Sequence, residues 1–334
     1  MNPRRGLLLA GPLVALAAVA GLWQSARRAE QTELDRADAA LARSAAAFFS
    51  VVVPPGPANG YDPARLLSAV NNLERASFWP GGVQLALGAV PLLPDTIGLA
   101  PVPDSLLKQL DAGREAVIAR HPRHRVALVP FLDRDRWGML GWVAAWGSIR
   151  PQLPSLLSGL LTTLAVVGIV LSALAFLREA ERRWRIIAFV CALGVLAVLA
   201  VDLRWSVGRA ARSAAEVQVL TLKRLIEVAA TAPGVRQAML PEIAVGVQVR
   251  PLAQAPPVET DVRWVEEPTG PAVTVVAATP RTQGALELTL HPDRQEPARL
   301  TRWLAMWVGL GALGLGLTAG GARIRPTVPV GTAS

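Results

Sequence analysis

Residues 154–177, with the sequence PSLLSGLLTTLAVVGIVLSALAFL, carry no charged side chain. The nearest arginines are Arg150 before this stretch and Arg178 directly after it. About 20 apolar residues in a helix suffice to cross the hydrocarbon of a bilayer, where a buried charge costs several kcal/mol. The stretch therefore predicts a transmembrane helix, and it assigns the chain to the integral membrane proteins.

Three other stretches have the same apolar character and predict further membrane-spanning helices. They comprise residues 6–23, 186–205 and 301–321. The span at 186–205 is interrupted by Asp202, which near the bilayer surface can reach lipid headgroups or pair with Arg204. The stretch 6–23 has an alternative interpretation as a cleaved signal peptide, since residues 1–5 would supply its basic start.

The composition of the whole chain supports a membrane protein. Hydrophobic residues make up 52% of the 334 residues and charged residues only 18%, with a mean hydropathy of +0.37. Soluble domains carry about a quarter charged residues. The apolar content excludes a disordered chain, and the single Cys191 excludes a secreted fold held together by disulfides. The net charge of +9 would, in a soluble protein, point to nucleic acid as a partner.

The positions of the arginines attribute this charge to membrane topology instead. Short segments outside the spans hold most of the excess, in Arg4, Arg5, Arg178, Arg182, Arg183, Arg185, Arg323 and Arg325 against Glu179 and Glu181. Short basic segments stay on the cytoplasmic side, so the turn at 178–185, the tail at 322–334 and both termini are predicted to be cytoplasmic. We therefore expect residues 24–153 and 206–299 to lie outside the cytoplasm, and we expect no nucleic-acid partner. A Gram-negative periplasm and an extracellular face fit this topology equally well, and a bacterial inner-membrane protein with both segments in the periplasm is our prediction.

The two predicted periplasmic segments begin alike. Residues 27–53 are rich in Ala, Leu, Glu and Arg, and residues 206–230 place apolar side chains at helical spacing. Both stretches predict long helices that continue out of the membrane. The first is expected to end at the prolines of residues 54–57 and the second at Pro233-Gly234.

Short runs typical of β-strands follow each of these helices. In the first segment they are Gly82–Leu93, Arg125–Leu132 and Met139–Trp146, with a helix predicted at Asp104–Ala119; in the second they are Val245–Leu252, Val262–Glu266, Ala272–Ala278 and Ala285–Leu290. The last two runs of each segment are spaced as a hairpin. The tripeptide Gly-Val-Gln occurs in the first run of both segments, at 82–84 and 246–248. This shared plan predicts an internal duplication.

Residues 126–141, VALVPFLDRDRWGMLG, have the pattern of a strand, an acidic turn with a glycine, and a second strand. This ending, after a long helix and before a return into the bilayer, resembles the extracytoplasmic PAS-like or CACHE-type sensor domains of bacterial histidine kinases and chemoreceptors. The resemblance implies domains that bind small metabolites or protein partners and relay their state by helix displacement. The predicted fold is a membrane α+β protein with four transmembrane helices and two periplasmic PAS-like α/β domains arranged as an internal duplication.

The most basic cluster of the first segment lies at residues 120–125, RHPRHR. Its composition favours a solvated basic turn, and the alternative is a pocket for a carboxylate or phosphate. In that pocket the donors would be Arg120, Arg123 and Arg125. A metal site at His121 and His124 is disfavoured, because the arginines repel a divalent cation and Pro122 prevents a regular helix. We expect no metal and no cofactor, and a small anion as the candidate ligand.

Three tryptophans lie just after this cluster, at Trp137, Trp142 and Trp146. Trp142 and Trp146 share one face of a strand, which favours a packed sheet face or a membrane-surface anchor over an aromatic ligand box. Together with the three arginines, Trp137 is a candidate ligand-binding residue.

Residues 309–314, GLGALG, match the GxGxxG pattern of dinucleotide sites. Such a site needs the motif after a strand at an exposed helix start, whereas here it lies inside an apolar span. Close helix packing is the better interpretation, because small residues recur every three or four positions. This small-residue stripe comprises Ala305, Gly309, Ala312, Gly316 and Gly320. The alternative is a generic apolar span whose glycines have no packing partner.

The sequence shows no pattern of a catalytic nucleophile, zinc protease, phosphate loop or redox site, so we expect that the protein is not an enzyme. We expect a sensory or signal-transducing membrane protein that acts through a membrane partner or another copy of the chain. The tail after Gly321 is too short for an output module, so the output is expected in a separate protein. The alternative is a structural or accessory subunit of a bacterial membrane complex.

Overall fold

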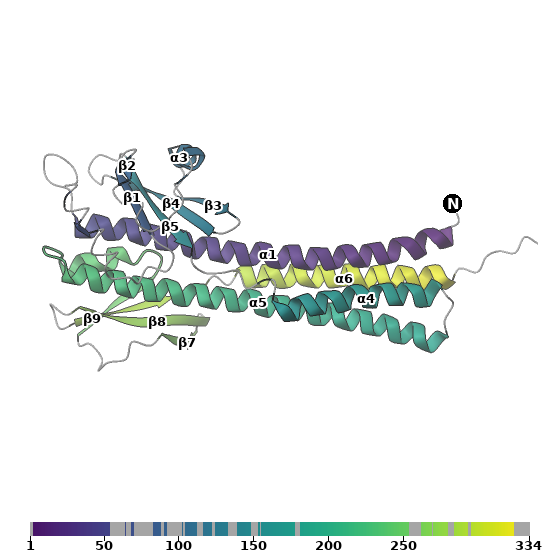
Figure 1. Ribbon diagram of the computed structural model, residues 1–334. Coiled ribbons are helices and arrows are strands. Elements are labelled where there is room, and N and C mark those ends of the chain that lie inside the picture. Colours follow the sequence, from purple (N-terminus) through teal and green to yellow (C-terminus); the bar gives the residue numbers. More distant parts are fainter. Residues whose placement is uncertain are drawn as a thin grey trace, which may run out of the picture. The chain divides into compact units, whose positions relative to one another are not determined.

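The computed structural model describes residues 3–53, 64, 68–69, 83–87, 90–91, 102, 104–111, 116–121, 124–132, 139–147, 153, 155–177, 181–253, 262–268, 270–279, 284–292 and 295–323. These residues form long helices and antiparallel strands (Figure 1). The chain divides into two compact units. We call them the helical unit, which comprises Met1–Gln31, Pro151–Ala210 and Asp293–Ser334, and the sheet unit, which comprises Thr32–Arg150 and Ala211–Pro292.

Four helices contribute to the helical unit. They are α1 (Pro3–Val52), α4 (Leu156–Leu177), α5 (Arg182–Thr231) and α6 (Gln295–Arg323). The unit boundary falls within α1 and within α5, so only the first part of each belongs here. Their apolar side chains form one core, in which Leu22 of α1, Ile169 of α4, Leu196 of α5 and Leu304 of α6 are buried. The two 50-residue helices confirm the prediction that helices continue beyond residues 27 and 206.

The start of α4 is held by local and long-range hydrogen bonds. The hydroxyl of Ser155 accepts a 3.0 Å hydrogen bond from the backbone N–H of Ser158, which is a typical N-cap contact. Just before α4 begins, the N–H of Leu153 donates a 3.2 Å hydrogen bond to the buried carboxylate of Glu30 in α1. These contacts explain why the helix begins two residues after the predicted boundary at Pro154.

Within the described part of the chain, three helices are long and apolar enough to cross a membrane. They are Leu156–Leu177, Arg182–Thr231 and Pro297–Ala319. They contain or overlap the predicted spans at 154–177, 186–205 and 301–321, and they indicate a membrane protein of mixed helix and sheet. The predicted span at 6–23 lies within α1, whose side chains at residues 3–9 are outside the described part of the structure. That span stays a prediction.

The first sheet of the sheet unit has five strands in the order β2-β1-β5-β4-β3, with every neighbouring pair antiparallel. The strands are β1 (Val83–Leu87), β2 (Val90–Pro91), β3 (Val117–His121), β4 (His124–Leu132) and β5 (Met139–Gly147). The short helix α3 (Asp104–Asp111) packs on this sheet through Leu106 and Leu110. The pairing of β4 with β5 confirms the predicted hairpin pairing.

The second sheet has four strands in the order β6-β9-β8-β7, again antiparallel throughout. The strands are β6 (Gln248–Leu252), β7 (Arg263–Glu267), β8 (Gly270–Thr279) and β9 (Gly284–Leu290). A 3-10 helix, η1 (Gln237–Ile243), precedes them. Apart from the short β2, both sheets therefore have one strand order: the first strand lies beside the last, followed by the hairpin partner and then the remaining strand.

Two elements differ from the sequence prediction. The helix predicted at Asp104–Ala119 ends at Asp111, and residues 117–121 form β3. The apolar positions of 104–110 fit a helix, but Gly113 disfavours its continuation, and the β-branched Val117 and Ile118 favour a strand. The 3-10 helix η1 was not predicted. The proline turn at 54–57 and the hairpin turn at 133–138 lie outside the described residues.

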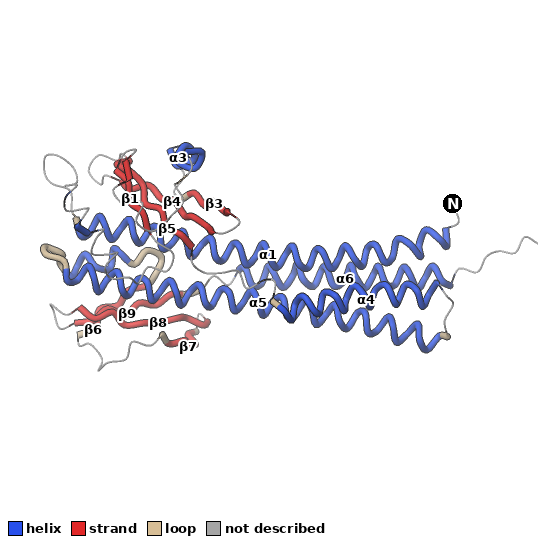
Figure 2. The backbone as a smooth tube through the Cα atoms, viewed as in Figure 1, coloured by secondary structure: helices blue, strands red, loops and turns tan. Residues whose placement is uncertain are grey.

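In the sheet unit the second parts of α1 and α5 lie between the two sheets (Figure 2). The unit has one main core, to which residues of both helices and both sheets contribute. Phe48 and Phe49 of α1, Leu222 of α5, Val143 of β5 and Leu288 of β9 are all buried in one cluster. The second parts of α1 and α5 thus pack with both sheets. The bounds predicted for the two periplasmic domains, 24–153 and 206–299, stay a prediction.

The two sheets differ in how their second faces are covered. In β4 every residue from Arg125 to Val129 is buried, because one face meets the main core and the other meets α3 and Trp142. In β8, buried Val273, Val275 and Ala277 alternate with half-buried residues. Alternation of this kind is typical of an antiparallel sheet that is covered on one face only.

Candidate functional site

Arg125 and Asp38 form a buried ion pair in the sheet unit. The Nε of Arg125 donates a 2.8 Å hydrogen bond to Oδ2 of Asp38, and the two side chains are 10% and 2% exposed. Alternate residues of a strand share a face, so Arg125 follows Ala127 and Val129 of β4 onto the side of the main core. The pair therefore attaches the first sheet to α1.

Burial has the largest effect on the pKa of the Asp38 carboxyl group. It raises the pKa of Asp38 above its ordinary value near 3.8, while the charge and the hydrogen bond of Arg125 lower it and the charge of Asp35 raises it. A buried carboxyl group of this kind is more costly to ionise in the folded chain than in the unfolded chain.

This shift predicts a pH dependence of stability. Asp38 contributes stability that is fully present below pH 3.8 and is lost as the pH rises through its raised pKa. The free energy of unfolding of the unchanged chain, relative to that of Asp38→Asn, is therefore expected to fall as the pH rises above 3.8. Denaturant unfolding of both proteins at several pH values measures the difference. A difference that grows with pH would contradict the raised pKa.

The second sheet is attached to α5 by a different polar contact. Nε1 of Trp264 in β7 donates a 2.8 Å hydrogen bond to Oε1 of Glu216. The guanidinium carbon of Arg212 lies 5.8 Å from the centroid of the same indole ring. Each sheet is thus joined to a long helix by one carboxylate, from Asp38 on α1 and from Glu216 on α5.

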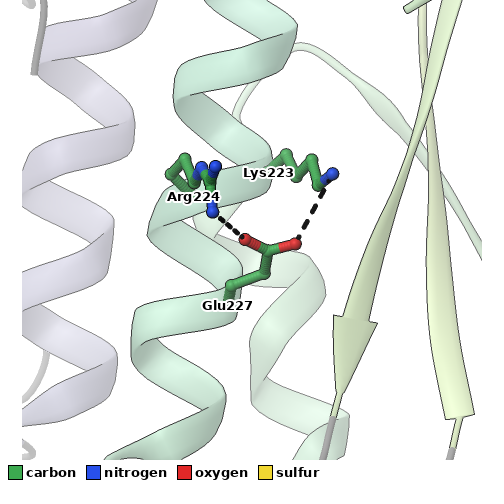
Figure 3. Close-up of polar contacts among 3 residues, drawn as sticks. All are labelled: Lys223, Arg224 and Glu227. Carbon is green, nitrogen blue, oxygen red and sulfur yellow. Dashed lines mark hydrogen bonds and ion pairs between the residues drawn. The ribbon is translucent and has the colours of Figure 1, made fainter. Parts of the chain in front are cut away.

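A second carboxylate of α5 is shared by two cations (Figure 3). Oε1 of Glu227 lies 3.7 Å from Nζ of Lys223, and its Oε2 accepts a 3.2 Å hydrogen bond from Nη1 of Arg224. The Lys223 side chain is 4% exposed, whereas that of Arg224 is 59% exposed. Since a buried ammonium group needs a counter-charge, Glu227 acts chiefly as the partner of Lys223.

Glu227→Gln is therefore expected to lower the free energy of unfolding by about 1–3 kcal/mol, because it leaves the buried Lys223 ammonium without its carboxylate. The matched control Arg224→Gln removes the exposed cation of the same cluster and is expected to cost less than about 1 kcal/mol. Denaturant unfolding of the full chain in detergent provides the measurement. Equal losses in the two variants would show that the buried lysine does not depend on Glu227.

A groove of ≈ 380 Å³ lies between α1 and the start of β3. Its α1 side is lined by residues from successive turns of the helix, among them Asp35, Arg36 and Arg43. Its other side is lined by Ala116 and Ile118. Asp35 is buried, and Arg36 forms a 3.3 Å contact with Glu33. Guanidinium groups suit the recognition of carboxylate and phosphate, so this groove has the chemistry for a small anionic molecule.

Arg125, one of the four predicted ligand residues, does not line this groove. Of the four, only Arg125 has a described side chain, and its buried contact with Asp38 differs from the predicted solvated turn. Arg120 is the β3 register partner of Arg125, while Arg123 and Trp137 lie outside the described residues. Trp142 is 5% exposed and packs with α3, which confirms a packed sheet face. Among the described residues, no group of three His, Cys, Asp or Glu side chains is placed to bind a metal.

In the helical unit, α1 and α6 approach each other closely through glycines. A Cβ atom added to Gly314 would lie 2.6 Å from the carbonyl oxygen of Gly11 and 2.8 Å from the nitrogen of Ala15. One added to Gly21 would overlap the indole of Trp307, whose Nε1 donates a 3.0 Å hydrogen bond to Ser25. These residues form an antiparallel seam between the two helices.

The small-residue stripe predicted on α6 does not form this seam. A Cβ atom on Gly309 or Gly316 would meet nothing within 4 Å, and Ala305 is exposed. Ala312 is half-buried, and the exposure of Gly320 is outside the described part of the structure. Close packing inside this chain instead involves Gly311 and Gly314, which lie on another face of the same helix.

A comparison of the chain with protein-family models, curated proteins and solved structures finds no match. The function is therefore inferred from the residues and their geometry alone.

Proposed function

We propose that the protein is a membrane-embedded sensor that detects a small anionic ligand in its sheet unit and relays the bound state along α1 and α5. The observation that carries the proposal is the continuity of these helices. Each is an unbroken helix of 50 residues, with its first part in the helical unit and its second part in the core of the sheet unit. At 1.5 Å per residue each is about 75 Å long, so each helix is a continuous connection from one unit to the other.

Two finer features of the fold belong to the same proposal. On α1 the seam extends from Gly11 to Ser25, and it lies against α6, which has the length and composition of a membrane span. This contact supports a fourth span in α1. The common strand order of the two sheets supports an internal duplication. Both features fit a layout of PAS-like or CACHE-type sensor domains between membrane spans, with both termini in the cytoplasm of a bacterial cell.

The groove beside α1 is the proposed ligand site. Its arginines, Arg36 and Arg43, lie on the long helix that would carry the response, and Ile118 belongs to the sheet that packs on this helix. A ligand bound between the two would alter the contact of β3 with α1. We propose no catalytic reaction at this site; the output would come from a separate membrane protein or from another copy of the chain.

Ligand binding is tested with the full chain in nanodiscs, because the two sheets share a core. Organic acids, amino acids and inorganic phosphate are screened for a rise in the unfolding temperature. At least one is expected to stabilise the chain, and Arg43→Gln is expected to abolish that rise while Arg224→Gln, a change of an equally exposed class on α5, leaves it intact. Stabilisation that survives Arg43→Gln would exclude the groove as the site.

The relay is tested by spin-label distances within the helical unit. Labels replace Leu13 of α1 and Leu313 of α6, which are 66% and 56% exposed, after Cys191→Ser removes the native thiol. The ligand found in the screen is expected to shift the distance distribution. An unchanged distribution, together with stable co-purification of a large membrane complex, would favour the structural or accessory subunit instead.

A further inference from the structure

Besides the groove in the sheet unit, the structure has a groove in the helical unit. It lies between α1 and α4 and has a volume of ≈ 770 Å³. Its α1 wall extends from Leu16 to Gln31. Fifteen residues of rise correspond to about 22 Å. That length matches one leaflet of a bilayer, which is about 20–22 Å thick when the headgroup region is included.

The polarity of the groove changes along this length. Leu16, Val19 and Ala20 of α1 form one end together with Val166 of α4, so that end is entirely apolar. Four polar residues follow on the same wall of α1 and form the other end, namely Gln24, Arg27, Arg28 and Gln31. Of the residues that the structure describes, none that lines the groove is acidic. An occupant must therefore combine an apolar chain with an anionic or strongly polar head.

Trp23 marks the boundary between the two ends. Its Nε1 donates a 2.6 Å hydrogen bond to Oγ1 of Thr162, which joins α1 to α4 at this level. The guanidinium carbon of Arg27 lies 5.7 Å from the centroid of the Trp23 ring. Tryptophan with a neighbouring arginine is typical of the level at which lipid headgroups begin.

We propose that this groove binds an anionic phospholipid of the bilayer, with an acyl chain along Leu16, Val19 and Val166 and the phosphate near Arg27. Charge complementarity and the apolar-to-basic order along one helix face identify this occupant. A soluble anion would not fill the apolar end of the groove, and an uncharged lipid would not bring a negative charge to Arg27. The proposal requires only that the helical unit lies in a membrane, and it is independent of ligand sensing by the sheet unit.

Native mass spectrometry of the delipidated full chain in detergent tests the proposal. The added probes are phosphatidylglycerol, phosphatidylcholine, diacylglycerol and inorganic phosphate. Phosphatidylglycerol is expected to bind about fivefold or more tightly than phosphatidylcholine, and the other two probes are expected not to bind detectably. Equal binding of the two phospholipids, or tight binding of phosphate alone, would overturn the proposal.

Two variants locate the bound lipid at opposite ends of the groove. Arg27→Gln is expected to weaken phosphatidylglycerol binding about fivefold, and Ala20→Phe is expected to displace the acyl chain by filling the apolar end. The matched controls are Arg302→Gln and Ala17→Phe, which change exposed residues that do not line the groove. Retention of full phosphatidylglycerol selectivity in Arg27→Gln and in Ala20→Phe would refute this site, and losses confined to these two variants would support it.

Discussion

At pH 7 the Arg125→Met variant is expected to lose about 3–5 kcal/mol of unfolding free energy, because it leaves the buried carboxylate of Asp38 without its guanidinium. Methionine retains much of the apolar length of arginine, so lost packing contributes less. The measurement is denaturant unfolding of the full chain in detergent, followed by circular dichroism. The loss is expected to shrink on acidification, because burial already raises the pKa of Asp38 and the protonated carboxyl group needs no counter-charge.

Two further variants separate the ion pair from general damage to the core. Asp38→Asn added to Arg125→Met removes the uncompensated charge, so the double variant is expected to be more stable at pH 7 than Arg125→Met alone. Arg224→Met, at an exposed ion pair, is expected to change stability by less than about 1 kcal/mol. A double variant less stable than Arg125→Met would show that the asparagine disturbs the core more than the buried charge does.

Features encoded by local patterns were predicted well from the sequence. Three apolar stretches coincide with helices of membrane length, and both 50-residue helices and both hairpin pairings follow from helical spacing and short β-rich runs. The tripeptides at 82–84 and 246–248 also mark equivalent places, because Gln84 in β1 and Gln248 in β6 each pair with the last strand of their sheet. These signals extend over a few turns or one hairpin, so no knowledge of the tertiary fold is needed to detect them.

Contacts between distant segments could not be predicted in this way. Arg125 lies 87 residues from Asp38, and nothing in RHPRHR distinguishes Arg125 from the other two arginines of the cluster. The groove at Arg36 and Arg43 likewise depends on where β3 lies against α1, and β3 itself was predicted as the end of a helix. The main core of the sheet unit also depends on contacts between distant segments, because residues of α1, α5 and both sheets contribute to it. Amphipathic spacing shows that a helix buries one face but not how many sheets will cover it.

The glycines of α6 show this limit most clearly. The sequence contains two sets of small residues at helical spacing, and the recurrence of the small-residue stripe, which includes Gly316 and Gly320 as a GxxxG pair, favours that stripe as the packing face. The structure shows the close approach at Gly311 and Gly314 instead. Spacing identifies residues that share a face of a helix, but only the neighbouring helix determines which face is packed.

Gly314→Ala is accordingly expected to destabilise the helical unit by about 3 kcal/mol or more, at the upper end of the usual cost of overpacking. The added Cβ atom would meet backbone atoms of Gly11 and Ala15, which cannot rotate away as a side chain can, so α1 and α6 must separate. That separation would also weaken the hydrogen bond between Trp307 and Ser25. Thermal unfolding of the full chain in detergent, followed by tryptophan fluorescence, measures the loss.

Gly309→Ala and Gly316→Ala are the matched controls, since a Cβ atom at either position meets nothing within 4 Å. Alanine favours a helix over glycine by up to about 1 kcal/mol, so both controls are expected to be neutral or slightly stabilising. A loss at Gly309 or Gly316 as large as that at Gly314 would contradict the seam as the main close contact of α6. It would indicate that the small-residue stripe packs against another helix, such as one from a second copy of the chain.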